Sequence, residues 1–136
     1  MSIQESANQF FDACETGKGW DVCSSWCLPN ASFSAQAGAL AEVTTLAAYC
    51  DWMKGLLVPI PDGHYELKSM AIDNDRQIAL AYAVFHGTHT VEGPVPPTGK
   101  TVAADYVYSM EFQDGKIRHM TKIWNDDHSL KQLGWA

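Results

Sequence analysis

Residues 101–124, TVAADYVYSMEFQDGKIRHMTKIW, decide the fold, because apolar and polar side chains alternate along two runs with a turn between them. Alternation with a period of two is typical of β-strands that bury one face. The pair Asp114-Gly115 favours a tight turn, so Thr101–Phe112 and Ile117–Trp124 are predicted to form an antiparallel hairpin.

Two earlier runs, His64–Asp73 and Gln77–Thr90, alternate in the same way around the turn signal Asn74-Asp75. They are predicted to add two antiparallel strands to the sheet. The connection Glu92–Lys100, EGPVPPTGK, is rich in proline and is expected to form a loop at the rim of a pocket.

The N-terminal half has helical spacing instead. Helices are predicted over Ile3–Cys14, Trp20–Trp26 and Leu40–Leu57, with a short strand at Ala31–Ala35 and a last helical turn after Asp126. Helices followed by a run of antiparallel strands predict an α+β fold with the helices packed on one face of a curved sheet. One domain over residues 1–136 is expected, because that length suits a single core.

Composition excludes several classes of protein. The chain has 9 basic and 16 acidic residues, a net charge of −7 that argues against binding nucleic acid or an anionic membrane. No apolar run reaches the ~20 residues of a membrane span. The N-terminus MSIQESANQFF does not resemble a secretory signal, so a soluble cytoplasmic protein is expected. Phosphate-loop, dinucleotide-binding, G-x-S-x-G and H-E-x-x-H motifs are absent.

The four cysteines are interpreted as reduced, buried thiols. Cys23 and Cys27 would share a helix face, but a zinc site needs two further ligands and no second pair has matching spacing. We therefore expect no metal site.

Strand periodicity divides Gln77–Thr90 into two faces. The bulkier set, which includes Ile78, Leu80, Tyr82 and His86, is predicted to face the helices, and the set with the alanines and His89 to face away.

In the hairpin, a two-residue loop would place Phe112 opposite Ile117 and Met110 opposite His119, with Asp105 on the other face. A bulge or a longer loop would exchange these partners, so the facing of Asp105 and His119 stays open.

Polar side chains on these strands suggest an acid–base site. Asp105 and His119 are the candidate catalytic residues, since carboxylate and imidazole groups transfer protons near neutral pH. The alternatives are an imidazole satisfied within the core, and a solvated Asp105 or one paired with Lys122. The candidate ligand-binding residues combine aromatic rings with polar groups and are His86, Tyr82, Tyr106, Tyr108, Lys122, Trp124, Trp52 and Met53. The large apolar members of this set can equally be core residues.

The stretch from Asp105 to the end of the chain resembles the C-terminal part of SnoaL-like polyketide cyclases, in the nuclear transport factor two-like superfamily. The resemblance lies in Asp114-Gly115-Lys116-Ile117, in Trp124 and in Leu130-x-Gln132-Leu133-Gly134. It implies a cone-shaped α+β barrel around an apolar pocket, often in a homodimer, and enzymes that mostly need no metal or organic cofactor. In the cyclases a catalytic aspartate follows the turn, and Lys122 stands at that position here.

Three functions therefore remain open. The first is a cofactor-free isomerase, dehydratase or cyclase that acts on a small apolar carbonyl or hydroxyl compound. The second is a non-catalytic pocket for an apolar ligand, which Lys122 in place of the aspartate favours. The third is a dimerisation or docking module that uses the flat alanine face of Gln77–Thr90. Fold alone does not choose among them.

Overall fold

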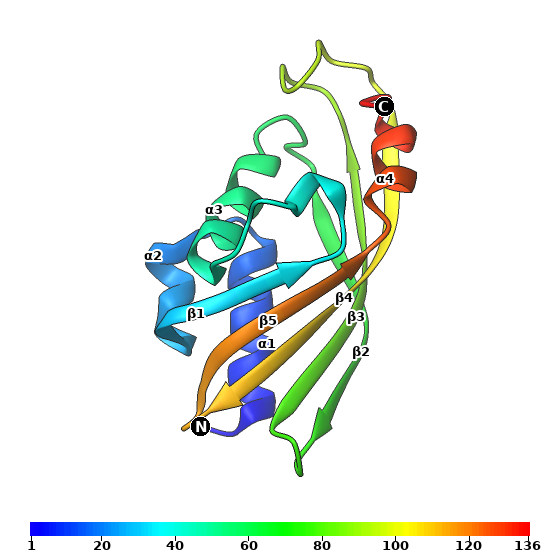
Figure 1. The fold of residues 1–136 in the computed structure, drawn as a ribbon. Coiled ribbons are helices and arrows are strands. Elements are labelled where there is room, and N and C mark those ends of the chain that lie inside the picture. The colour runs from blue at the N-terminus through cyan, green and yellow to red at the C-terminus, as the bar shows by residue number, and fades with distance from the viewer.

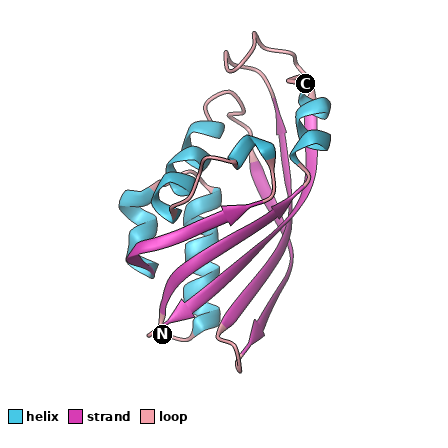
Figure 2. Ribbon diagram, viewed as in Figure 1, coloured by secondary structure: helices cyan, strands magenta, loops and turns pink.

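The computed structural model describes all residues from Met1 to Ala136. Helices lie in the first half of the chain and at its C-terminal end, one strand lies between the N-terminal helices, and the other strands follow in the second half (Figures 1 and 2). The elements in order are α1 Ile3–Glu15, α2 Trp20–Cys23, η1 Ser24–Trp26, β1 Cys27–Ala35, η2 Gly38–Leu40, α3 Leu46–Leu56, β2 His64–Asp73, β3 Ile78–Thr88, β4 Thr101–Gln113, β5 Lys116–Trp124 and α4 Asp126–Leu133.

The five strands form one sheet in the order β1-β5-β4-β3-β2. All neighbours pair antiparallel except β1, which joins β5 in parallel at the sheet edge. The sheet curves but does not close, and α1 and α3 lie on one of its faces (Figure 1). This arrangement confirms the predicted α+β fold with helices on a curved, mostly antiparallel sheet. No helix has both the length and the apolar character needed to cross a membrane.

Local sequence explains where the helices begin and end. Ser2 caps α1 in a reciprocal capping box with Glu5, and Thr45 accepts a hydrogen bond from the Ala48 amide (3.1 Å) at the start of α3. The α3 helix is therefore shorter than the predicted Leu40–Leu57 helix. Gly134, with φ +74°, ends α4 in the left-handed conformation.

The prediction for the two faces of β3 is wrong. Ala79, Ala81 and Ala83 are fully buried under the helices, whereas Leu80 and Tyr82 are 44% and 39% exposed. Side-chain bulk misled the assignment because α1 packs closely over this part of the sheet, and small alanines leave room for its phenylalanines. The sheet face under the helices is called the inner face below, and the opposite one the outer face.

A β-bulge between Glu111 and Phe112 changes the pairing in the hairpin. Phe112 lies opposite Ile117 as predicted, but His119 pairs with Glu111 and not with Met110. The extra residue on β5 turns every later side chain of that strand over. Met120 and Lys122 therefore face inward and His119 faces outward, which resolves the facing that the sequence left open.

The loop between β3 and β4 is tied to the C-terminus through His89. The prediction that His89 faces away from the core is wrong, because its side chain is completely buried. Its Nδ1 atom accepts hydrogen bonds from the Trp135 indole (2.9 Å) and from the Thr98 amide (3.2 Å). These bonds hold the Glu92–Lys100 connection and the end of the chain against one end of the sheet.

Candidate functional site

A cavity of about 590 Å³ lies between the inner face of the sheet and the helices. Most of its lining residues are hydrophobic. They come from α3 and the segment after it, from β3 and β4, from α4 and from the loop at Gly93, and include Leu56, Ile60, Phe85, Val102, Ala104, Leu130, Leu133 and Trp135. Few charged side chains line this space. Two of them are Glu15 of α1 and Lys122 of β5.

Glu15 ends α1 and is only 2% exposed. Its two carboxylate oxygens accept hydrogen bonds from the hydroxyls of Tyr106 and Tyr108 on β4. Because the Tyr108 proton is used for Glu15, the hydroxyl of Tyr49 on α3 donates in turn to the Tyr108 oxygen. The result is a buried hydrogen-bonded chain that runs from α3 to the carboxylate.

The environment of Glu15 shifts its proton affinity. Burial raises the pKa of its carboxyl, and the positive charge of Lys122 and the two tyrosine hydroxyls only partly oppose that effect. A carboxyl with a raised pKa can exchange a proton closer to neutral pH than an exposed glutamate can. The Tyr106 and Tyr108 hydroxyls stay protonated, because burial and the nearby carboxylate raise the pKa of both.

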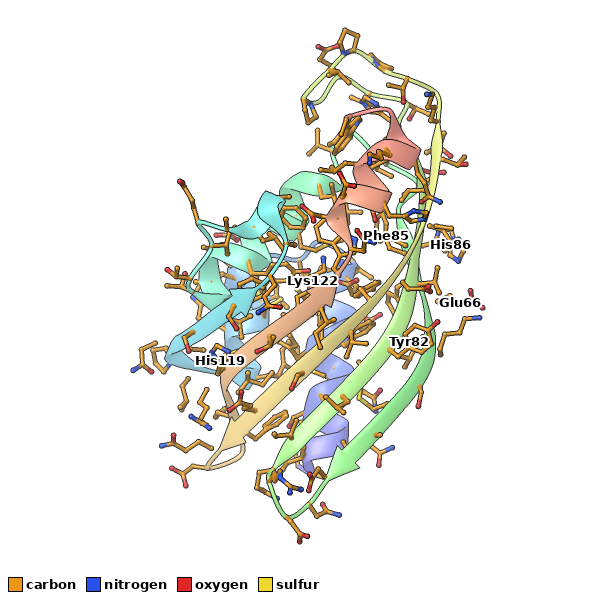
Figure 3. The ribbon with its side chains drawn as sticks, turned by 45° about the vertical axis from the view of Figure 1, so that its right-hand side comes forward. Glu66, Tyr82, Phe85, His86, His119 and Lys122 are labelled. Atoms are coloured by element: carbon orange, nitrogen blue, oxygen red, sulfur yellow. The ribbon has the colours of Figure 1, made fainter.

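Lys122 projects from β5 on the helix side of the sheet and is 6% exposed (Figure 3). Its Nζ atom lies 4.3 Å from the ring centre of Trp124, 5.2 Å from those of Tyr49 and Trp52, and 5.3 Å from that of Tyr106. Such rings attract a cation through their negative faces. Desolvation nevertheless lowers the pKa of Lys122 to about 8, although the charge of Glu15 works in the opposite direction.

Five of the residues predicted to bind a ligand line this cavity, namely Trp52, Met53, Tyr106, Lys122 and Trp124. Tyr108 lies just behind them and contacts the cavity only through Glu15. The structure thus brings Lys122 together with the tryptophans and two of the tyrosines of the predicted set.

The other predicted residues lie on the outer face. His86 bonds Glu66 through Nε2 (3.2 Å), and Asp105 accepts a hydrogen bond from Tyr82 (3.1 Å). Figure 3 labels Glu66, Tyr82 and His86 along the same side of the sheet. None of these side chains lines the apolar cavity, so its geometry gives no support to a catalytic role for Asp105 there.

His119 has polar neighbours of its own on β1 and β5. Its ring nitrogens lie 2.7 Å from the Ser32 hydroxyl and 3.0 Å from that of Ser34, and Thr121 is 3.1 Å away. These contacts satisfy the imidazole with hydroxyl groups, as in the structural alternative considered for it, but on the outer face and not within the core. A second, more open hollow of about 780 Å³ on this face includes Tyr82, Asp105 and Thr121.

Glu15 was missed as a functional candidate. It lies four residues after Phe11 and eight after Ala7, both fully buried, so helical spacing places its carboxylate on the core face of α1. A carboxylate at a core position of an amphipathic helix is the signal that could have identified it.

Comparison with known proteins agrees with this architecture. A curved α+β sheet that encloses a mostly apolar cavity against its helices defines a class of small-molecule-binding folds. The family model of the SnoaL-like domain matches residues 7–120, and the chain belongs to this family. A search of curated protein sequences gives no match.

Solved structures with the same fold cover nearly the whole chain. IdmH, a candidate polyketide cyclase from Streptomyces antibioticus, is 18% identical, with a TM-score of 0.79 over 98% of this chain and 99% of that one. AclR, a candidate hydroxylase from Streptomyces galilaeus, is 21% identical, with a TM-score of 0.78 over 98% and 85% of the two chains. SalBIII, an epoxide hydrolase/cyclase-like enzyme of pyran ring formation in salinomycin, is 15% identical, with a TM-score of 0.67 over 90% of each chain. At these identities the likeness concerns the fold alone.

Proposed function

We propose that the protein is a cofactor-free enzyme that moves protons on a small, largely apolar carbonyl compound bound in the inner cavity. The observation that carries this proposal is the buried Glu15 carboxyl, held by two tyrosine hydroxyls and facing an apolar space that also contains Lys122. An isomerase, dehydratase or cyclase of this kind needs one group to take a proton and another to stabilise the oxygen that becomes negative.

We assign these roles to residues that line the cavity. The carboxylate of Glu15 abstracts a proton next to the carbonyl group, and its raised pKa makes it a stronger base than an exposed glutamate. The Lys122 ammonium group and the Tyr106 hydroxyl lie on the same cavity wall and stabilise the enolate oxygen. The mostly apolar lining makes the surroundings less polar than water, which strengthens both interactions.

Binding is tested first, by thermal unfolding with steroids, aromatic polyketide fragments, terpenoids and long-chain ketones. A ligand at about a hundred times its dissociation constant should add ~2.7 kcal/mol of stability. Two neighbouring alanines of β4 provide a matched pair: Ala104→Trp fills the cavity, whereas Ala103→Trp changes the exposed outer face. Ligands should stabilise the wild type and the Ala103→Trp variant but not the Ala104→Trp variant. Equal stabilisation of both variants would place the binding site elsewhere and refute the proposal.

Catalysis is tested next, by turnover of each stabilising ligand with the wild type and with Glu15→Gln. Conversion by the wild type alone supports the enzyme. Binding without conversion by either protein supports a non-catalytic ligand-binding domain. This second function is favoured by Lys122, which stands where the related cyclases carry an aspartate.

A homodimer is also proposed. Several apolar side chains on the outer face are exposed, among them Leu80 (44%) and Ile123 (62%), and a second copy that covers them would remove apolar surface from water. Analytical ultracentrifugation of the wild type across a concentration series tests this, and a monomer at every concentration would contradict it.

The four cysteines are all free thiols, which suits the reducing cytoplasm that we propose as the location of the protein.

A further inference from the structure

The amine of Lys122 has no hydrogen-bonded partner. Each ion pair of the structure joins other residues, and none of the side-chain hydrogen bonds involves Nζ of Lys122. Four aromatic rings surround the atom at 4.3–5.3 Å from their centres, and the side chain forms part of the cavity wall. The amine is thus held in an apolar space and remains open to whatever enters the cavity.

This environment raises the fraction of neutral amine above that of a solvated lysine. With a pKa of about 8, about a tenth of the Lys122 side chains carry a free lone pair at pH 7. A fully solvated lysine has on the order of one free amine in 2,500 at the same pH. Desolvation of a lysine in an apolar pocket is a recognised way of making it a nucleophile for carbonyl groups.

We propose that Lys122 forms an imine with the carbonyl carbon of an aldehyde or ketone bound in the inner cavity. This inference deepens the proposed function and rests on it for the carbonyl ligand. It gives Lys122 a covalent role, whereas the acid–base scheme alone uses it as a fixed positive charge.

The step balances without an oxidant or reductant. The Nζ lone pair attacks the carbonyl carbon, the π electrons of the carbonyl bond move to its oxygen, and one of the two amine protons passes to that oxygen, which gives a neutral carbinolamine. Loss of the second amine proton and of the hydroxyl group as water then leaves a carbon–nitrogen double bond. Two groups that line the same cavity can deliver the proton that water needs to leave, namely the protonated form of Glu15 and the hydroxyl of Tyr106.

The imine would also assist proton transfer. Once protonated, it withdraws electrons from the neighbouring carbon more strongly than the parent carbonyl group does, so a proton on that carbon becomes more acidic. Glu15 on the adjacent wall is the base that removes it. In this scheme Lys122, the aromatic rings around it and Glu15 all act on the same bound carbonyl compound.

Reductive trapping tests the proposal on the wild-type protein. The protein is incubated at pH 7 with 4-phenylbutan-2-one or benzaldehyde, treated briefly with sodium borohydride, and examined by intact mass and by peptide mapping. Reduction of the imine adds the mass of the probe less one oxygen atom. We expect this adduct on the peptide that contains Lys122, at ten or more times the level on any exposed lysine, given the difference in free amine.

Variants separate the outcomes. Lys122→Arg keeps the positive charge and should abolish trapping, whereas Lys18→Met changes an exposed lysine and should leave it intact. Adduct spread evenly over the lysines, or no adduct on Lys122, would overturn the imine. If 4-phenylbutan-2-one still stabilises the protein against heat and the protein still accelerates deuterium exchange next to its carbonyl group, the failure concerns the imine alone. If this ketone neither binds nor exchanges, the proposed function fails as well.

Discussion

Replacing Lys122 by methionine removes a buried charge and keeps a long, flexible apolar side chain in its place. In the folded protein the pKa of Lys122 is about 8, against an ordinary value of 10.5. At about 1.4 kcal/mol for each tenfold change in the ionisation constant, holding the charged lysine in the fold costs about 3 kcal/mol below pH 8. Attraction by the four rings offsets part of this cost.

The sign of the pH effect follows from proton binding. Between pH 8 and 10.5 the unfolded chain holds the lysine proton more tightly than the folded chain does, so the lysine's contribution to stability increases with pH. It is least favourable below pH 8, and about 2 kcal/mol of the cost should be recovered between pH 7 and 9.5. Lys122→Met abolishes this dependence, because the side chain no longer titrates.

Urea unfolding followed by tryptophan fluorescence measures the effect. The stability of the wild type relative to Lys122→Met should increase by about 2 kcal/mol from pH 7 to 9.5, and buried tyrosines and cysteines cancel in the difference. The same comparison in a Glu15→Gln background removes the carboxylate that acts most strongly on the lysine, and Lys18→Met serves as the exposed control. A difference that stays constant with pH in both backgrounds would refute the buried, charge-disfavouring environment of Lys122.

Three further changes have defined outcomes. Tyr106→Phe removes one hydroxyl that lowers the pKa of Glu15, so that pKa should rise further. The acidic limb of the pH–rate profile should then move to higher pH, and an unchanged limb would exclude Glu15 as the titrating base. Gly87→Ala would bring a Cβ atom to 2.3 Å from Cγ2 of Ile60, so thermal unfolding should show a loss of about 1–3 kcal/mol, and unchanged stability would contradict this packing. Ile123→Lys puts a charge on the outer face and should convert the proposed dimer to monomer in ultracentrifugation, whereas a dimer of unchanged affinity would place the interface elsewhere.

The sequence was most informative where the signal is local. The run His64–Asp73 has the bounds predicted for it, and the strand after it differs by no more than two residues at either end. Turn pairs such as Asp114-Gly115 fix hairpins through short-range backbone geometry, so neighbouring strands were found correctly. The parallel pairing of β1 with β5 joins distant segments, and nothing in the local alternation specifies it.

Which residues face the cavity depended on features that alternation does not encode. A single extra residue in β5 reversed the facing of His119 and brought Lys122 inside. Side-chain size did not identify the buried face of β3, because α1 packs close to that face and small alanines fit beneath it. Helical spacing is enough to place Glu15 on the core face of α1. Its candidate role also depends on the hydroxyls of Tyr106 and Tyr108, which come from a strand some ninety residues away.

Proton abstraction by Glu15 in the apolar cavity is tested most directly by deuterium exchange. Ketones that stabilise the protein are incubated with it in deuterated water, and deuterium next to the carbonyl carbon is followed by mass spectrometry. The wild type should exchange this position faster than buffer alone, and Glu15→Gln should slow the exchange about a hundredfold or more while Asp105→Asn leaves it unchanged. Exchange that is as fast in Glu15→Gln as in the wild type, for a ligand shown to occupy the cavity, would contradict the assignment of Glu15 as the base.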